Sequence, residues 1–363
     1  MKEHPLFNLD RNLPPQPVEF RDALHSTLLQ IAHSERLDDV MRHHRYGENE
    51  TDQLAGNKWL AGRFGDIDLN GRIVLTNGAK NGVLLLLSLL ADPGDTIVTE
   101  ELSALAAWEI PRLLGIRVIG TPIDAEGIVP ETFEQICKLH APKALFTVPT
   151  LHNPTTHVLG LGRRQSISRI AENFGMTIIE DDICGMLAPE APPPFACITP
   201  SNAWYVTGVG KTLSPGFRLG YIVAPNSQGA RDFIRRFRST TTWIPSPVSA
   251  EIIAHWITDG TAKRVLATVR EEVVARQFIA TRLLNEFDIV TKPWALNIWL
   301  RLPMYRTASD LLLAARREGI CLGAASIFSA TPDRPTNSVR ICLGGPSSRE
   351  ELETALQTLS SLI

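Results

Sequence analysis

Short β-rich runs alternate with helix-period segments from about residue 72 onward. The strands that this pattern predicts cover residues 73–76, 96–98, 117–120, 144–147, 177–180, 204–207 and 221–223. The helical segments between them cover residues 83–90, 105–114 and 163–174. Such alternation is typical of an α/β fold with a parallel or mostly parallel sheet covered on both faces. The polar residues that follow the strands should then meet at the carboxyl edge of the sheet.

The hydrophobic pattern changes past residue 249, where longer helical segments take over. We expect helices over residues 249–257, 262–285, 308–318 and 348–361, and short strands over residues 298–301 and 339–343. These elements predict a smaller α+β domain. A chain of 363 residues also exceeds the size at which a single core usually divides. We therefore predict an N-terminal arm that joins the small domain, a large domain and a small C-terminal domain, over residues 1–45, 46–250 and 251–363.

Charge and cysteine content restrict the partners of the chain. Lysine plus arginine number 36 against 39 acidic residues, a net charge of −3, which predicts no binding to nucleic acid or to a membrane surface. Basic and apolar residues are mixed in segment 233–238, which is typical of the solvated face of an amphipathic helix. The five cysteines are odd in number and too widely spaced for a metal or redox motif. We therefore expect no metal and a reducing compartment.

No membrane span or export signal is expected. The longest apolar run, residues 83–91, is too short to cross a bilayer. Residues 1–10 lack the apolar core of a secretion signal, so we predict a cytoplasmic protein.

The stretch VTGVGKTLSPGFRLGY at residues 206–221 contains a Gly-Lys-Thr sequence that raises the question of a nucleotide-binding P-loop. A P-loop needs an earlier glycine that four residues separate from the Gly-Lys pair, and a helix directly after it. Tyr205 occupies the position of that glycine. Pro215 and Gly216 stop a helix soon after Lys211. The P-loop interpretation therefore fails on both sides of Lys211.

Polar residues close several of the predicted strands, at the edge of the sheet where a ligand would bind. Each one alone has an ordinary explanation as a surface charge, a turn residue or a helix cap. Together they offer an anion site at a glycine turn, an amide, an acid, a lysine and an arginine. That set fits pyridoxal phosphate, an aromatic phosphate with a basic ring nitrogen and an aldehyde. In chain order these residues are Gly78, Ala79, Lys80, Asn153, Asp181, Lys211 and Arg218.

The motifs around these residues resemble the fold-type I aminotransferases, and most closely the catalytic domain of MocR-type regulators of the GntR family. The resemblance covers residues 75–345, in the stretches LTNGAKNGV, ADPGDTIVTEE, VPTLHNPTTHVLGLGRR, IIEDDICGML, GKTLSPGFRLGYIVAP and NSVRICLGG. It implies a mostly parallel mixed sheet sandwiched by helices, plus a smaller α+β domain. MocR regulators also carry an N-terminal winged helix. This chain starts about where their catalytic domain would, so we expect it to lack the DNA reader.

The resemblance implies a role for each candidate residue. Lys211 matches the lysine that forms a Schiff base with pyridoxal phosphate and can then move the Cα proton of the substrate. Asp181 matches the carboxylate that keeps the ring nitrogen protonated. Asn153 matches the amide that bonds the ring hydroxyl and borders the substrate. Arg218 matches the phosphate clamp, assisted by the turn at residues 78–80.

The resemblance extends to the substrate and to a second subunit. Arg340 in NSVRICLGG matches the arginine that grips the carboxylate of an amino acid substrate with a bidentate fork. A surface arginine on an edge strand is the ordinary alternative for this position. Tyr46 in RYGENE matches a tyrosine that usually reaches the phosphate of a neighbouring subunit. It therefore implies a homodimer with shared active sites.

Several positions depart from the family pattern. Cys184 stands where a tyrosine usually contacts the ring oxygen, and Ala104 where an aromatic residue usually stacks on the ring. Gly208 and Gly210 replace serines that help to bind phosphate, and Lys80 replaces a glutamine. Each lost contact is worth about 1 kcal/mol, so cofactor binding is still expected. The changes bear on which substrate bond is broken.

We therefore expect an enzyme that uses pyridoxal phosphate to act on an α-amino acid, by default an aminotransferase. A lyase, a decarboxylase or a biosynthetic tailoring enzyme would keep the same cofactor and stays open as an alternative. A non-catalytic sensor that binds the cofactor and an amino acid effector also stays open. The sequence does not predict the substrate side chain, the amino acceptor or the pathway.

Overall fold

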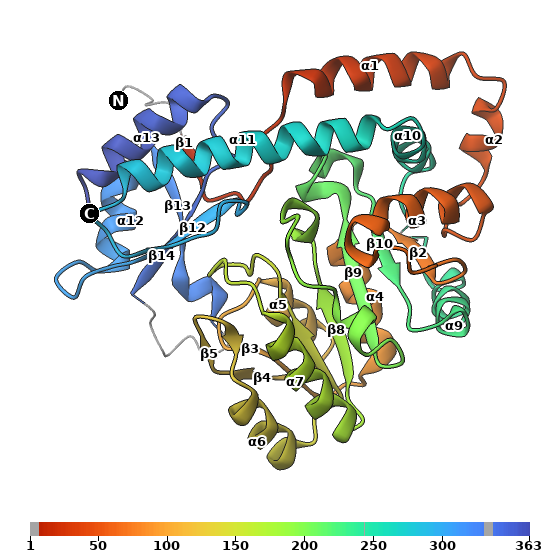
Figure 1. Ribbon diagram of the computed structural model, residues 1–363, viewed down its shortest axis with the longest axis horizontal. Coiled ribbons are helices and arrows are strands. Elements are labelled where there is room, and N and C mark those ends of the chain that lie inside the picture. The colour runs from red at the N-terminus through yellow and green to blue at the C-terminus, as the bar shows by residue number, and fades with distance from the viewer. Residues whose placement is uncertain (1–6, 243, 330–336) are drawn as a thin grey trace.

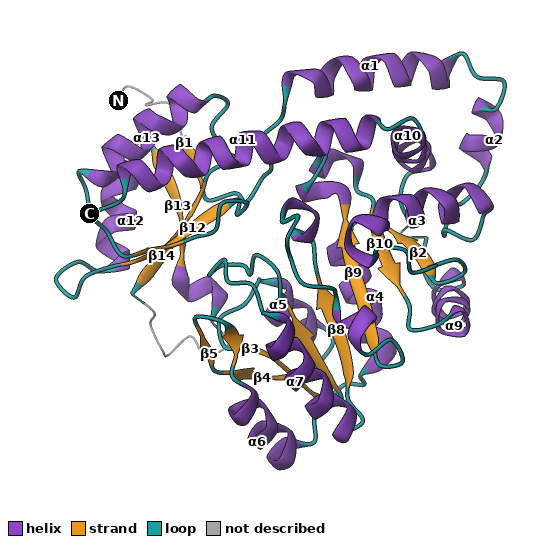
Figure 2. Ribbon diagram, viewed as in Figure 1, coloured by secondary structure: helices purple, strands orange, loops and turns teal. Residues whose placement is uncertain are grey.

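The computed structural model describes residues 7–242, 244–329 and 337–363 (Figure 1). The start of the predicted N-terminal arm, residues 1–6, lies outside these ranges. The strands of the described chain form a seven-stranded sheet, a five-stranded sheet and a two-stranded ribbon, with helices packed around them (Figure 2). None of the described helices is both long enough and apolar enough to span a membrane.

The seven-stranded sheet is mixed and mostly parallel. Strand β10 is antiparallel to both of its neighbours, whereas the other neighbouring pairs are parallel. The sheet therefore has the strand arrangement that the sequence predicts. In spatial order its strands are β2 (Ile73–Thr76), β10 (Gly220–Val223), β9 (Ala203–Gly208), β8 (Thr177–Asp181), β7 (Ala144–Thr147), β3 (Thr96–Glu100) and β4 (Arg117–Thr121).

Helices cover both faces of this sheet because successive strand residues point to opposite sides. On β8, for example, Ile178 belongs to one hydrophobic cluster and Ile179 to another. The prediction of an α/β fold with a sheet sandwiched by helices is confirmed. The helices on one face are α4 (Ala79–Leu90), α5 (Ala106–Leu113) and α9 (Ser227–Arg238). Those on the other face are α3 (Glu50–Phe64), α6 (Pro130–His140), α7 (Leu161–Asn173), α8 (Phe195–Ile198) and α10 (Pro247–Thr258).

The five-stranded sheet is the centre of a smaller α+β part of the molecule. Strand β1 pairs in parallel with β13, so the first described residues of the chain belong to this sheet. The domain boundaries at residues 45 and 250 stay a prediction. The strands in spatial order are β1 (Phe7–Leu9), β13 (Ile320–Ala324), β14 (Ser338–Cys342), β12 (Asn297–Arg301) and β11 (Ile289–Val290). The helices packed on them are α11 (Thr261–Leu283), α12 (Ala308–Arg317) and α13 (Arg349–Ser360).

The amphipathic helix predicted from the basic run is α9. Its Phe233, Ile234 and Phe237 are buried, whereas its last arginines are exposed to solvent. This arrangement agrees with the interpretation of the run as the solvated face of an amphipathic helix.

The hydrophobic pattern does not predict several elements, which lie along the whole chain. Helix α3 shows the physical reason, because its Asp52, Gln53 and Arg63 are buried while Leu54 is 63% exposed. Apolar periodicity cannot mark a buried face that is built from polar contacts. The elements that the pattern misses are α1 (Val18–Ala32), α2 (Leu37–Arg42), α3, α6, α8, β1, β11, β13 and the ribbon of β5 (Ile123–Asp124) and β6 (Gly127–Ile128).

A fully buried ion pair fastens the loop that follows β7. Arg164 on α7 lies 2.9 Å from Glu180 on β8, and both side chains are 0% exposed. Arg164 also donates to the hydroxyl of Thr150 at 2.7 Å and to the carbonyl of Pro149 at 3.2 Å. These contacts hold the loop that leads to Asn153 against the sheet.

We expect Arg164→Met to lower the free energy of unfolding by about 3–5 kcal/mol, because the change leaves Glu180 buried without its cation. Urea denaturation monitored by circular dichroism measures the loss. Arg163→Met is the matched control, since the carboxylates that pair with Arg163 are 46% and 71% exposed. That change should cost less than about 1 kcal/mol. Equal losses in the two variants would contradict the prediction.

Candidate active site

A cavity of about 340 Å³ lies between the carboxyl ends of β8 and β9 and the five-stranded sheet. Every residue predicted to bind the cofactor or the substrate lines this cavity except Tyr46. The structure therefore brings together polar residues that follow separate strands. The other lining residues are Asn12, Ala104, Leu105, Ala106, Ile183, Gly208, Gly210, Pro215, Leu219 and Phe328.

Asp181 and Lys211 come from neighbouring strands. Asp181 is the last residue of β8, and Lys211 ends η2 (Val209–Lys211), the turn directly after β9. The parallel pairing of the two strands brings both side chains to one edge of the sheet. Asp181 is 5% exposed, and its Oδ1 atom has no hydrogen-bond partner within the described part of the chain. Buried carboxylate oxygens normally have partners, so this atom is suited to a donor from a bound molecule.

Burial changes the acid–base properties of both groups. It raises the pKa of Asp181 to about 7, and the neighbouring carboxylate of Asp182 adds to the increase. Burial lowers the pKa of the Lys211 amine. The Nζ atom of Lys211 donates a hydrogen bond to the carbonyl oxygen of Asn12. A lower amine pKa increases the fraction of neutral amine, which is the form that attacks a carbonyl carbon.

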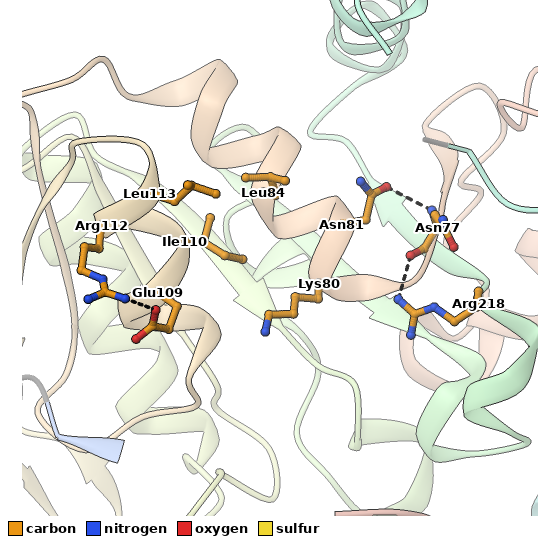
Figure 3. Close-up of a pocket in the computed structure, with 9 residues that line it drawn as sticks. All are labelled: Asn77, Lys80, Asn81, Leu84, Glu109, Ile110, Arg112, Leu113 and Arg218. Atoms are coloured by element: carbon orange, nitrogen blue, oxygen red, sulfur yellow. Dashed lines mark hydrogen bonds and ion pairs between the residues drawn. The ribbon is translucent and has the colours of Figure 1, made fainter. Parts of the chain in front are cut away.

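An anion site lies where β2 leads into α4. Gly78 has a φ of 82°, and a Cβ atom there would lie 3.0 Å from Nη2 of Arg218, so glycine lets the guanidinium approach the start of the helix. The same Nη2 atom donates to the carbonyl of Asn77 at 3.2 Å. Lys80 extends from the first turn of α4 (Figure 3). These cations and the free amides of a helix N-terminus favour a phosphate group.

Arg340 on β14 lines the cavity and is 7% exposed. Its Nη1 atom donates to Oδ1 of Asn153 at 2.9 Å, and its Nη2 atom donates to the carbonyl of Asp10 at 2.6 Å. The guanidinium carbon lies 4.6 Å from the centre of the Phe328 ring. Its Nε atom has no partner among the residues that the structure describes. An arginine held in this way suits a carboxylate ligand.

Sequence reasoning missed the N-terminal segment and the turn that contains Phe328. Asn12 lines the cavity, and Asp10 contacts Arg340. Neither segment carries a motif. They reach the cavity through the pairing of β1 with β13 and through a bridge between Leu102 and Ser329. The sequence points to these contacts only through the prediction that the N-terminal arm joins the small domain. That prediction does not say which residues of the arm would reach the cavity.

Four of the five residues that depart from the family pattern line the cavity, namely Lys80, Ala104, Gly208 and Gly210. Ala104 is buried and contributes a methyl group to the wall. Burial raises the pKa of the Cys184 thiol to about 12, so this thiol stays neutral near Asp181. Gly208 lies against the backbone, since a Cβ atom there would be 3.0 Å from the carbonyl of Leu219. The protein therefore offers the ring fewer polar and aromatic partners than the family pattern does.

Tyr46 does not line the cavity of its own chain. Its ring lies 5.0 Å from the guanidinium carbon of Arg238. A larger pocket of about 760 Å³ shares Lys80 and Arg218 with the cavity and extends between α4 and α5 (Figure 3). Its wall includes Leu113, which is 75% exposed. The anion site is therefore accessible from this side of the molecule.

The fold and the cavity define a fold-type I α/β protein with a site for a phosphorylated pyridine. The anion site suits the phosphate, and the Asp181 oxygen that lacks a partner among the described residues suits a protonated ring nitrogen. Lys211 supplies a buried amine in the same cavity. The residues present therefore fit pyridoxal phosphate.

Comparison with known proteins gives the family. The model for aminotransferase class I and II matches residues 8–359, so the chain belongs to this family. It is 25% identical to the HTH-type transcriptional regulator YdeF of Bacillus subtilis over 93% of this chain and 72% of YdeF. It is 26% identical to the aromatic amino acid aminotransferase C1773.13 of Schizosaccharomyces pombe over 81% of this chain and 71% of that protein. The chain spans 57 to 72% of the length of the matching HTH-type regulators of Bacillus subtilis and Escherichia coli.

A solved structure shares the fold. LysN, the α-aminoadipate aminotransferase of Thermus thermophilus in complex with N-(5'-phosphopyridoxyl)-L-leucine, has a TM-score of 0.86 at 18% identity. The match covers 98% of this chain and 92% of LysN. The resemblance to fold-type I aminotransferases and MocR-type regulators that the motifs indicate is confirmed.

We expect the pH dependence of stability to report on Asp181. Its pKa is about 7 in the folded chain against an ordinary value of 3.8, so its ionisation opposes folding as the pH rises between these values. Asp181→Asn removes this effect. Without added cofactor, the stability of the variant relative to the parent should therefore rise by on the order of 2 to 4 kcal/mol from pH 4 to pH 7. Urea denaturation at each pH measures the difference, and parallel profiles for the two proteins would contradict the prediction.

Proposed function

We propose that this protein is an aminotransferase that moves the amino group of an α-amino acid, with Lys211 as the residue that binds pyridoxal phosphate covalently. The observation that carries the proposal is that Lys211, Asp181 and an anion site face one cavity. Membership of the class I and II aminotransferase family supports the reaction type. The phosphopyridoxyl compound bound to LysN supports the choice of cofactor.

Each residue of the cavity has a task in this proposal. Pyridoxal phosphate supplies an aldehyde that receives the amino group and a protonated ring that withdraws electrons from Cα. Lys211 would hold the cofactor covalently through Nζ, and its neutral amine would be the group that moves the proton at Cα. Asp181 holds the proton of the ring nitrogen with the oxygen that has no partner in the described chain. Arg218 and the amides of residues 78–80 bind the phosphate.

Arg340 and Asn153 bind the substrate in the same proposal. Nη1 of Arg340 is oriented by Asn153 at 2.9 Å, and the carboxylate of Asp10 lies 3.7 Å from Nη2. When the substrate carboxylate binds the guanidinium of Arg340, it replaces the contacts that Asp10 makes with this group. Because arginine presents two parallel N–H groups to a carboxylate, this contact also orients the Cα–H bond of the substrate.

We expect the protein to show a visible absorption band when it is loaded with pyridoxal phosphate, because the cofactor bonds to Nζ of Lys211. The band should be absent in Lys211→Ala and shifted in Asp181→Ala, which removes the partner of the ring nitrogen. Lys80→Ala is the matched control, since Lys80 is a lysine of the same cavity and should leave the band in place at saturating cofactor. Absorption spectroscopy measures all four proteins.

The loaded protein should also convert an added 2-oxo acid to its amino acid when an α-amino acid is the donor. Amino acid turnover without amino transfer would indicate a lyase or decarboxylase, a possibility that Cys184 and Ala104 motivate. A spectral response to amino acids without turnover would indicate a sensor, the second candidate that the HTH-type regulators among the relatives favour. Protein that stays colourless with pyridoxal phosphate would contradict both the proposed enzyme activity and the proposed cofactor.

We further propose a cytoplasmic homodimer with shared active sites, which acts on an amino acid as a small-molecule substrate and needs neither nucleic acid nor a membrane. Tyr46 lies away from the cavity of its own chain, and the anion site is accessible from the pocket between α4 and α5. The exposed Leu113 in that pocket suits coverage by a second copy. The tyrosine of each subunit would then reach the phosphate site of the other.

Tyr46→Phe should leave the dimer intact and weaken pyridoxal phosphate binding about tenfold, the value of one hydrogen bond to a charged group. Analytical ultracentrifugation measures the subunit state, and a spectroscopic titration measures the dissociation constant. Tyr305→Phe is the control, because Tyr305 is 85% exposed and does not line the cavity. A monomeric parent protein at micromolar concentration would contradict the shared site.

A further inference from the structure

A buried ion pair lies behind Asp181, on the side of the strand end that faces away from the cavity. The next residue along the chain, Asp182, is 0% exposed, and its Oδ2 atom lies 2.8 Å from Nε of Arg63. Arg63 belongs to α3, and its side chain is 3% exposed. Neither residue lines the cavity, so the reaction proposed above leaves this pair without a role.

The position of the pair is fixed by contacts from several elements. Tyr205 on β9 donates its hydroxyl to Oδ2 of Asp182 at 3.0 Å. Arg63 donates to the carbonyls of Ala191 and Pro192 at 3.2 Å and 3.0 Å. A guanidinium that left Asp182 would therefore also lose its contacts with these two carbonyls.

The chain also makes room for the carboxylate of Asp182. A Cβ atom at Gly185 would lie 2.1 Å from Oδ2 of Asp182, which no side chain could tolerate without a shift. Burial alone would lower the pKa of Arg63, but the charge of Asp182 raises this pKa well above its ordinary value. The guanidinium is therefore permanently charged, and it forms an ion pair with the carboxylate of Asp182.

Asp181 is sensitive to these charges because its carboxylate is buried. Its Oδ1 atom lacks a partner in the described residues, and Cys184 replaces the hydroxyl that the family pattern places nearby. Charges act strongly over several ångströms in a site closed to water. The charged groups that act on Asp181 are Lys211, which stabilises its anion, and Asp182, Glu100 and Glu180, which oppose it.

We propose that Arg63 is a positioning residue for the reaction: it holds Asp182 as one half of a neutral pair, and so keeps Asp181 in the ionised form that the ring nitrogen of the cofactor needs. That Asp181 contacts the ring nitrogen of pyridoxal phosphate rests on the proposed function. The effect of Arg63 on the charge of Asp181 does not. Removing Arg63 uncovers a negative charge beside Asp181, and removing Asp182 uncovers a positive one. The two changes therefore act on Asp181 in opposite directions.

The test is the titration of Asp181 in the full-length chain, followed through the infrared band of its protonated carboxyl and assigned with Asp181→Asn. Arg63→Met should raise the midpoint by about one pH unit, and Asp182→Asn should lower it by about as much. The double variant Arg63→Met/Asp182→Asn should return close to the parent, and Arg63→Lys should restore most of the parental value. A loss of packing alone cannot shift the midpoint in two directions.

Tyr205→Phe is the matched control, since it removes a contact with the same Asp182 oxygen and no charge at neutral pH. It should lower thermal stability and leave the midpoint within a few tenths of a unit. A midpoint that does not move in Asp182→Asn overturns the proposal, even if Arg63→Met fails to fold. Shifts of the same sign in Arg63→Met and Asp182→Asn overturn it as well.

A second measurement separates this inference from the proposed function. Pyridoxine 5'-phosphate has the ring nitrogen but no aldehyde, so it binds without a bond to Lys211. Its affinity near pH 7.5 should fall about threefold in Arg63→Met and recover in the double variant, because a midpoint that rises from about 7 to about 8 lowers the ionised fraction of Asp181 about threefold at this pH. If the infrared midpoints move as expected and the compound binds none of the proteins, the proposed cofactor fails and the effect of Arg63 on Asp181 stands.

Discussion

The parallel pairing of β8 with β9 is the constraint on which the cavity depends. Two parallel neighbours end at the same edge of a sheet, so the acid at the end of β8 and the lysine just past β9 enter one space. Rigid strands set their separation, and long loops do not. Burial then acts on both groups at once, because it disfavours the charged form of each. The chemistry of the site follows from the topology of the sheet.

Much of this arrangement could be predicted from the sequence. Strand and helix alternate with strong periods past residue 72, and the polar residues that follow the strands include Asp181, Lys211 and Arg218. Their meeting in one cavity follows from the rule for parallel sheets. The helices α1 and α2 and the short strand β1 could not be predicted, because few of their residues are both apolar and fully buried.

The remaining contacts of the cavity depend on tertiary structure alone. Arg340 reaches Asp10 across almost the whole length of the chain, and Phe328 reaches the cavity from a turn without a motif. Arg63 is the clearest example. A charged residue is expected at the surface, but Arg63 is buried and donates hydrogen bonds to carbonyls of a proline-rich loop. No local pattern marks such a residue, since its partners lie more than a hundred positions away in sequence.

The N-terminal segment is at once an edge strand of the small sheet and part of the wall around Lys211. Strand β1 begins at Phe7, and Asn12 already contacts the lysine amine. A fusion partner or affinity tag joined directly before Phe7 would therefore be attached five residues from Asn12, the residue that contacts the reactive amine. The C-terminal helix α13 does not line the cavity, which makes that terminus the better place for a tag in preparative and structural work.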